Sequence, residues 1–141
     1  MNKLVDSWLI QLHKTTKNLA ILEGSFLNFN RDLMATSGTE RSYILKLSDY
    51  NNAKPKQRNI DLSEIDKMVK TREHKYTTEA SLRINDANGM KRPDEVVVIH
   101  YDSKEDGEIF RKNNGDILIK IGQFNQNHLT QFSYLIAHSN R

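Results

Sequence analysis

The residues best suited to proton transfer in this sequence are its histidines, because the imidazole pKa lies close to neutral pH. Two of the five histidines stand two residues before a threonine, in His13-Lys14-Thr15 and His128-Leu129-Thr130. A repeated His-x-Thr pattern is the first candidate for a catalytic pair. His13, however, falls within a stretch whose apolar spacing is typical of a helix.

Paired His-x-Thr motifs resemble those of the two-histidine phosphoesterases. The resemblance implies that His13 and His128 converge on one phosphodiester, one as base and one as acid. That family carries its motifs on strands, and here the two histidines are 115 residues apart. A phosphodiesterase or nuclease that uses His13 and His128 is therefore one alternative function.

Acidic residues near His100 are the next candidates, because carboxylates bind hard divalent cations. His100 and Asp102 point to the same face of an expected strand, with Asp106 and Glu108 nearby. Lys104 lies among these acids, and their spacing lacks the regularity of a calcium loop. We therefore expect a solvated acidic turn and no metal site.

Other motifs for catalysis or cofactor binding are missing from the sequence. Asp116 and Lys120 begin a metal-dependent nuclease pattern, but Leu118 stands where the second carboxylate is needed. A glycine-rich phosphate loop and a Gly-x-Ser-x-Gly turn are absent, and the lack of cysteine excludes thiolate-bound metals. We therefore predict no catalytic residue and no cofactor.

The strongest remaining signal is positive charge in the middle of the chain. Residues 41–93 hold twelve basic and seven acidic side chains, whereas the whole chain has a net charge of +3. Clustered basic residues beside aromatic rings are typical of single-strand binders. The predicted binding residues are Lys54, Lys56, Arg58, Lys67, Lys70, Arg72, Lys75, Lys91 and Arg92, flanked by Tyr50 and Tyr76.

Residues 3–34 carry apolar side chains at alternating spacings of three and four, the pattern of a helix with one apolar face. We expect a long N-terminal helix, kinked near Gly24, that packs on a sheet. A helix of about 45 Å would extend beyond a small domain and could join two copies of the chain. That expected oligomer interface consists of Val5, Trp8, Leu12, Leu19, Leu22 and Phe26.

The rest of the chain suggests an α+β fold with a mostly antiparallel sheet of about five strands. We expect a strand at 43–47, a basic loop from residue 50, a short helix 61–72 capped by Asp61 and Glu64, and a β-meander over 76–124. The segment 127–138 fits a terminal helix capped by Asn127, although a strand over 132–137 is an alternative. With 141 residues, one domain is expected.

These observations favour a small non-enzymatic binding protein over an enzyme. Its expected partner is nucleic acid or a nucleic-acid-handling protein, which it would occupy as an inhibitor or regulator. The alternative is a structural protein that assembles through the N-terminal helix. Neither a membrane span nor a signal peptide is expected, and the abundance of asparagine, lysine and isoleucine suggests the cytoplasm of a bacterium, including one infected by a phage.

Overall fold

The structure is a computed structural model that describes residues 7–14, 17–29 and 40–138, with side chains described for 22–27 and 40–136. In this part of the chain three helices accompany one antiparallel sheet of six strands, so the α+β class is confirmed. The strands are β1 (Ser7–Lys14), β2 (Lys17–Phe29), β3 (Ser42–Tyr50), β4 (Thr77–Asn88), β5 (Glu95–Tyr101) and β6 (Leu129–His138). The helices are α1 (Pro55–Lys70), α2 (Lys104–Asn113) and α3 (Gly115–His128).

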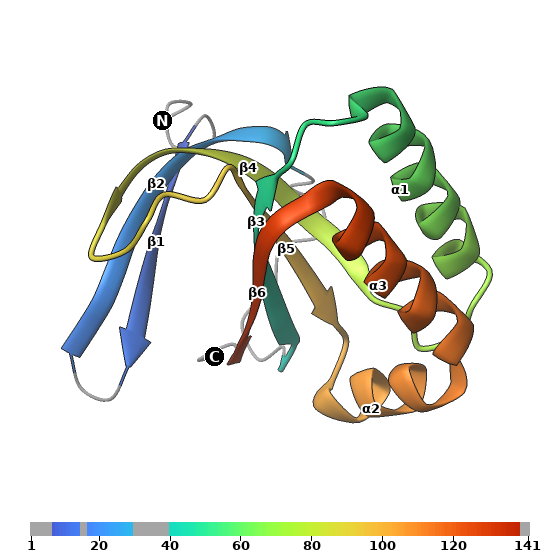
Figure 1. Ribbon diagram of the computed structural model, residues 1–141. Coiled ribbons are helices and arrows are strands. Elements are labelled where there is room, and N and C mark those ends of the chain that lie inside the picture. The colour runs from blue at the N-terminus through green and yellow to red at the C-terminus, as the bar shows by residue number, and fades with distance from the viewer. Residues whose placement is uncertain (1–6, 15–16, 30–39, 139–141) are drawn as a thin grey trace.

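The strands are ordered β1-β2-β4-β5-β3-β6 across the sheet. From β3 onward the chain follows the split β-α-β arrangement of ferredoxin-like folds, in which α1 connects β3 to β4 and α3 leads into β6. The β1–β2 hairpin extends this sheet beyond β4. Helices α1 and α3 lie side by side over one face of the sheet, and α2 joins β5 to α3 (Figure 1).

The predicted long N-terminal helix is wrong, because its described residues form the β1–β2 hairpin. Gly24 was expected to kink a helix, but it marks a register shift where β2 pairs with β4. A Cβ at this position would lie 2.5 Å from the backbone oxygen of Arg83, so the close approach of the two strands requires glycine. The same glycine therefore signals a β-bulge.

Helix α1 begins six residues before the predicted start at Asp61. Pro55 occupies its first turn, where a missing N–H is tolerated, so the proline expected in a loop begins the helix. Asp61 therefore lies inside the helix and does not cap it. Its carboxylate accepts one hydrogen bond from Gln57 and pairs with His128.

The predicted β-meander is confirmed only for β4 and β5. The later part of the expected meander folds as α2 and α3 instead of strands. Ser103 caps α2 by accepting a hydrogen bond from the Asp106 N–H at 3.0 Å. The terminal helix is also wrong: residues after His128 form β6, which pairs with β3 from Leu129 onward. The strand alternative for 132–137 described this region correctly.

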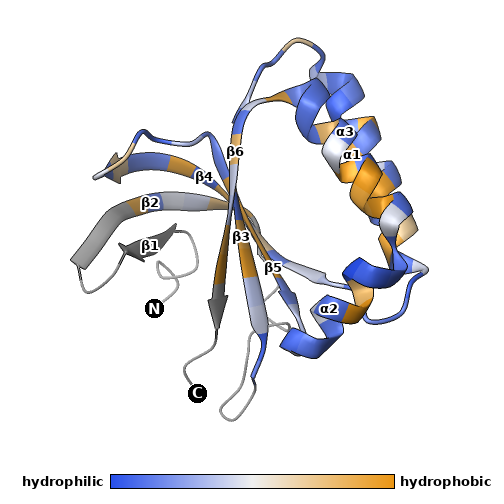
Figure 2. Cartoon of the chain, turned by 60° about the horizontal axis from the view of Figure 1, so that its bottom comes forward, coloured by the Kyte–Doolittle hydropathy of each residue, from blue (hydrophilic) through white to orange (hydrophobic). Residues whose placement is uncertain are grey.

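Two groups of buried residues hold the elements together, one on each face of the sheet. The face away from the helices buries Leu22, Leu47, Ala80, Leu82, Ile84, Val96 and Val98. The helix-covered face packs Tyr101 against Ile65, Val69, Phe110, Ile117, Phe124 and Leu129. Figure 2 shows hydrophobic residues on the strands of the bent sheet and along the paired helices α1 and α3. None of the described helices is long and apolar enough to cross a membrane.

Candidate functional site

A cleft of about 280 Å³ opens between the start of α1, the end of β3 and the β4–β5 connection. We call it the arginine cleft, because Arg58 of α1, Arg83 of β4 and Arg92 before β5 all line it. The remaining lining residues are Leu27, Tyr50, Asn52, Asp94 and Glu95. Three guanidinium groups from three separate segments therefore meet two carboxylates at one depression in the surface.

Tyr50, at the end of β3, holds both carboxylates of the cleft in place. Its hydroxyl donates a hydrogen bond to Glu95, and its backbone N–H donates to Asp94 at 2.9 Å. Burial and the adjacent Glu95 carboxylate raise the pKa of Tyr50 well above its ordinary value. The hydroxyl therefore stays protonated and remains a donor to Glu95.

Arg58 is fixed on top of the Tyr50 ring. The guanidinium carbon lies 3.9 Å from the ring centroid, a distance at which a cation interacts favourably with the π face. One nitrogen also donates to the Asn52 side-chain oxygen at 3.2 Å. Asn52 adopts a positive φ of 56°, a conformation that asparagine tolerates better than most residues. The turn before α1 thus positions this arginine.

The other two arginines differ in how firmly they are held. Arg92 donates from one nitrogen to the carbonyl oxygen of Ile84 at 2.7 Å, which uses part of its donor capacity. Arg83 is exposed, and its guanidinium makes no hydrogen bond or ion pair with another described residue. Its backbone pairs with Glu95 across the β4–β5 ladder. The Arg83 guanidinium therefore lies near a carboxylate that already accepts a hydrogen bond from Tyr50.

This arrangement is suited to binding an anion. Guanidinium groups present several N–H donors in a planar fork that matches the oxygens of phosphate or carboxylate. The three arginines exceed the two acids by one charge, and both acids already accept hydrogen bonds from Tyr50. A bound anion would therefore face free donors, chiefly on Arg83, while Tyr50 holds the two carboxylates in place.

The structure brings Tyr50, Arg58 and Arg92, all predicted from the sequence, to this single cleft. Arg83 was missed by the sequence reasoning, although it alternates with the apolar residues Leu82 and Ile84, as a residue on the opposite face of a strand would. Only the pairing of β4 with β5 shows that this side chain lies beside Glu95.

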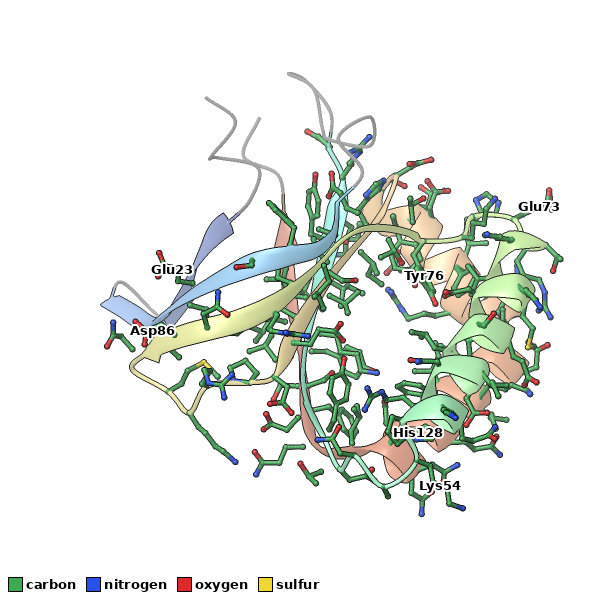
Figure 3. All side chains as sticks on the ribbon, turned by 90° about the horizontal axis from the view of Figure 1, so that it is seen from above. Glu23, Lys54, Glu73, Tyr76, Asp86 and His128 are labelled. Carbon is green, nitrogen blue, oxygen red and sulfur yellow. The ribbon has the colours of Figure 1, made fainter. Side chains whose placement is uncertain are left out.

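The other predicted binding residues are spread along α1 and its flanks. Lys54 stands at the start of α1, next to the end of α3 that carries His128 (Figure 3). Arg72 is engaged in a bidentate pair with Asp116, at 2.8 and 3.0 Å. Tyr76 packs its ring among core aromatics and points inward in Figure 3. Exposed side chains belong to Lys54, Lys56, Lys67, Lys70, Lys75 and Lys91.

Comparison with known proteins gives one informative match. No protein-family model and no curated protein sequence matches the chain. A solved structure titled "Crystal structure study of anthrone oxidase-like protein" superposes with a TM-score of 0.58 at 9% sequence identity. The alignment covers 87% of this chain and 55% of that one, so the chain spans about half the length of its match. The likeness is one of fold.

The two histidines of the His-x-Thr motifs lie in different parts of the fold. His128 is buried at the end of α3, where its Nε2 lies 2.7 Å from an Asp61 oxygen and its ring packs on Phe124. That hydrogen bond is the main cause of the lowered pKa of Asp61. His13 belongs to β1, and its side chain lies outside the described residues, so the pairing of the two histidines stays a prediction.

The acidic turn after β5 is occupied by local contacts. Asp106 pairs with His74 at 2.6 Å and accepts a hydrogen bond from the Ser103 hydroxyl at 2.9 Å. His100 does not join these contacts, because it is buried beside Glu79 and Tyr43. Burial lowers the pKa of His100. Within the described residues no three His, Asp or Glu side chains are grouped so as to hold a metal ion.

The expected oligomer interface has no helix to carry it. Leu22 has no exposed surface, and Phe26 is partly buried against the same core. Trp8, Leu12 and Leu19 lie in β1 and β2, but their side chains are outside the described residues, as is all of Val5. The described residues of this segment form strands in place of the expected helix, and assembly of the chain stays a prediction.

Proposed function

We propose that this protein binds single-stranded nucleic acid and that the arginine cleft holds one of its phosphates. The observation that carries the proposal is the convergence of Arg58, Arg83 and Arg92 on one cleft. Arginine forks bind phosphate oxygens bidentately, and such contacts supply most of the affinity of proteins that bind nucleic acids without reading sequence.

The surroundings of the cleft favour a polymer over a small anion. Lys54 and Lys56 are exposed at the beginning of α1, directly before Arg58, and Lys91 directly precedes Arg92. These lysines extend the positive surface past the cleft, so neighbouring phosphates of one strand would also be neutralised.

The size of the cleft favours a single strand over a duplex. A volume of about 280 Å³ is close to the lower end of ordinary ligand sites and accommodates one group of nucleotide size. A flexible strand can insert a phosphate there, whereas duplex DNA is usually read by a helix or ribbon that enters a groove. The acidic surface of a nucleic-acid-handling protein is the competing partner.

Binding without turnover is the behaviour of an inhibitor or regulator, and this is the role that we propose. The bacterial or phage origin and the cytoplasmic location remain part of the proposal, and they rest on composition alone.

Fluorescence anisotropy with labelled single-stranded DNA, single-stranded RNA and duplex DNA tests the proposal. We expect a single strand to bind at 50 mM salt and to dissociate as salt rises, because counterions are released on binding. Arg83→Ala should weaken binding about tenfold and reduce the salt slope by about 1, the expected effect of losing one charged phosphate contact.

Lys112→Ala is the matched control, because it removes one exposed positive charge on α2, outside the cleft. It should leave affinity and salt slope near the wild-type values. Absence of binding to all three nucleic acids at 50 mM salt would refute the proposal. Equal weakening by Arg83→Ala and Lys112→Ala would refute the role of the cleft.

A further inference from the structure

Two asparagines of the chain are followed directly by glycine, in Asn88-Gly89 and Asn114-Gly115. In this dipeptide the asparagine side chain is readily attacked by the next backbone nitrogen, because glycine has no Cβ to hinder the approach. The two pairs share this chemistry but lie in different surroundings.

Asn88 is the last residue of β4, at the point where the chain leaves the sheet. Its side chain is exposed, and its amide makes no hydrogen bond with another described residue. Gly89 has a φ of 90°, a conformation that residues with a Cβ rarely adopt. Asp86, two residues before Asn88, lies across the molecule from Glu73 in Figure 3. The amide of Asn88 is therefore free to turn toward the nitrogen of Gly89.

Asn114, in contrast, is held on both sides of its amide group. It is 5% exposed and joins α2 to α3. Its Nδ2 donates a hydrogen bond to the carbonyl oxygen of Phe110 at 2.8 Å, and its Oδ1 accepts one from Arg72 at 2.8 Å. Attack on this side chain requires both bonds to break first, so the fold protects Asn114.

We propose that Asn88 is a site of spontaneous deamidation. The backbone nitrogen of Gly89 loses its proton to hydroxide and attacks the Cγ atom of Asn88. The side-chain nitrogen takes up a proton and leaves as ammonia, and a five-membered succinimide ring remains. One water then opens the ring at either carbonyl carbon, which gives aspartate or isoaspartate. The net change consumes water and releases ammonia, with no oxidation or reduction.

Deamidation alters the connection between β4 and β5, which also carries Lys91 and Arg92. Each converted chain gains one negative charge there, and isoaspartate also adds one carbon to the main chain. Arg92 lines the arginine cleft, so the new carboxylate lies on the segment that supplies one of its three cations. The reaction itself does not depend on nucleic-acid binding.

Peptide mapping tests the proposal on the full chain. The folded protein is kept in a mildly alkaline buffer, and mass spectrometry of tryptic peptides gives the conversion of each asparagine over time. Asn88 should convert at least about tenfold faster than Asn114, because Asn114 must first lose two hydrogen bonds, one of them to a charged arginine. In concentrated urea the two rates should become similar, because unfolding removes the protection.

Asn88→Gln is the matched variant, because glutamine keeps the amide but forms the corresponding larger ring much more slowly. The fast conversion should disappear in this variant, while the rate at Asn114 stays unchanged. Circular dichroism establishes that the variant folds, and if it does not, the wild-type rates in buffer and in urea still decide. Equal rates at Asn88 and Asn114 in the folded protein, or conversion of Asn88 in urea but not in buffer, would overturn the proposal.

Discussion

Gly24 provides a sharp test of the structure, because alanine there should destabilise the sheet. An added Cβ would lie 2.5 Å from the backbone oxygen of Arg83 and 2.9 Å from Cδ1 of Ile84. The oxygen belongs to the backbone of β4, so it cannot move aside without disturbing the pairing of β2 with β4. The Ile84 side chain is 1% exposed and has little room to turn.

Overpacking of this kind lowers the free energy of unfolding by about 1–3 kcal/mol. Gly122 in α3 is the matched control, because a Cβ there meets nothing within 4 Å and the residue is exposed. Alanine at an exposed helical position is more favourable than glycine by about 0.5–1 kcal/mol. Replacing glycine with alanine should therefore lower the free energy of unfolding at position 24 and raise it at position 122.

Urea unfolding followed by circular dichroism measures both effects. Gly24→Ala should lower the midpoint by about 1 M and Gly122→Ala should raise it slightly, with the slope m unchanged in both. Wild-type stability of Gly24→Ala would show that β2 and β4 do not approach closely at this point. A shift in the same direction for both variants would refute the steric reasoning.

Two further substitutions test the helix-covered side. Phe110→Ala should lower the free energy of unfolding by about 3–5 kcal/mol, because Phe110 is 1% exposed and its ring contacts Tyr76 and Tyr101; a smaller loss in a thermal melt would contradict this. Asp61→Asn should make the free energy of unfolding less sensitive to acid. The hydrogen bond with His128 lowers the pKa of Asp61 from 3.8. The contribution of the Asp61 carboxylate to stability is therefore present above pH 4 and is lost as the pH falls further. Urea midpoints at pH 7 and pH 3 that fall as much in the variant as in the wild type would refute that assignment.

The central strands could be predicted because the spacing of their apolar residues in the sequence matches the residues that are buried in the sheet. Leu82 and Ile84 alternate with polar residues, and both are buried on one face of β4. Residues 96–101 form a nearly continuous apolar run, and β5 indeed lies between β4 and β3 inside the sheet.

The N-terminal hairpin was misread because a spacing of four residues suits both a helix and a strand. Leu22 and Phe26 lie four apart, and an even separation also returns a strand residue to the same face. The connection between β1 and β2 contains Thr15 and Thr16, without the glycine or asparagine that usually indicates a tight turn.

The segment after β5 shows how packing overrides intrinsic preference. Ile117, Ile119 and Ile121 alternate as a strand would, but in α3 Ile117 is buried while Ile119 is 64% exposed. Asn114-Gly115 has the composition of a hairpin turn, yet it joins α2 to α3, and the Asn114 amide donates to the carbonyl oxygen of Phe110. A one-residue connection between two helices is therefore hard to distinguish, from the sequence alone, from the turn of a β-hairpin.

Several residues of the arginine cleft could be predicted individually from the sequence, but their meeting in one cleft could not. Positive charge pointed to Arg58 and Arg92, and an adjacent aromatic residue pointed to Tyr50. Their meeting with Arg83 depends on the register between β4 and β5, a long-range relationship that charge counting does not contain.

Strand β3 supplies Tyr50 to the arginine cleft and Lys46 to the space under α3. Side chains four residues apart on a strand share a face, but these two have different neighbours. The β5 side offers Tyr50 the carboxylate of Glu95, which keeps its hydroxyl a donor. The β6 side and α3 offer Lys46 an amide and aromatic rings, which cannot neutralise its charge. The position of β3 between β5 and β6 therefore places the arginine cleft at one end of the strand and a partly buried ammonium group at its centre.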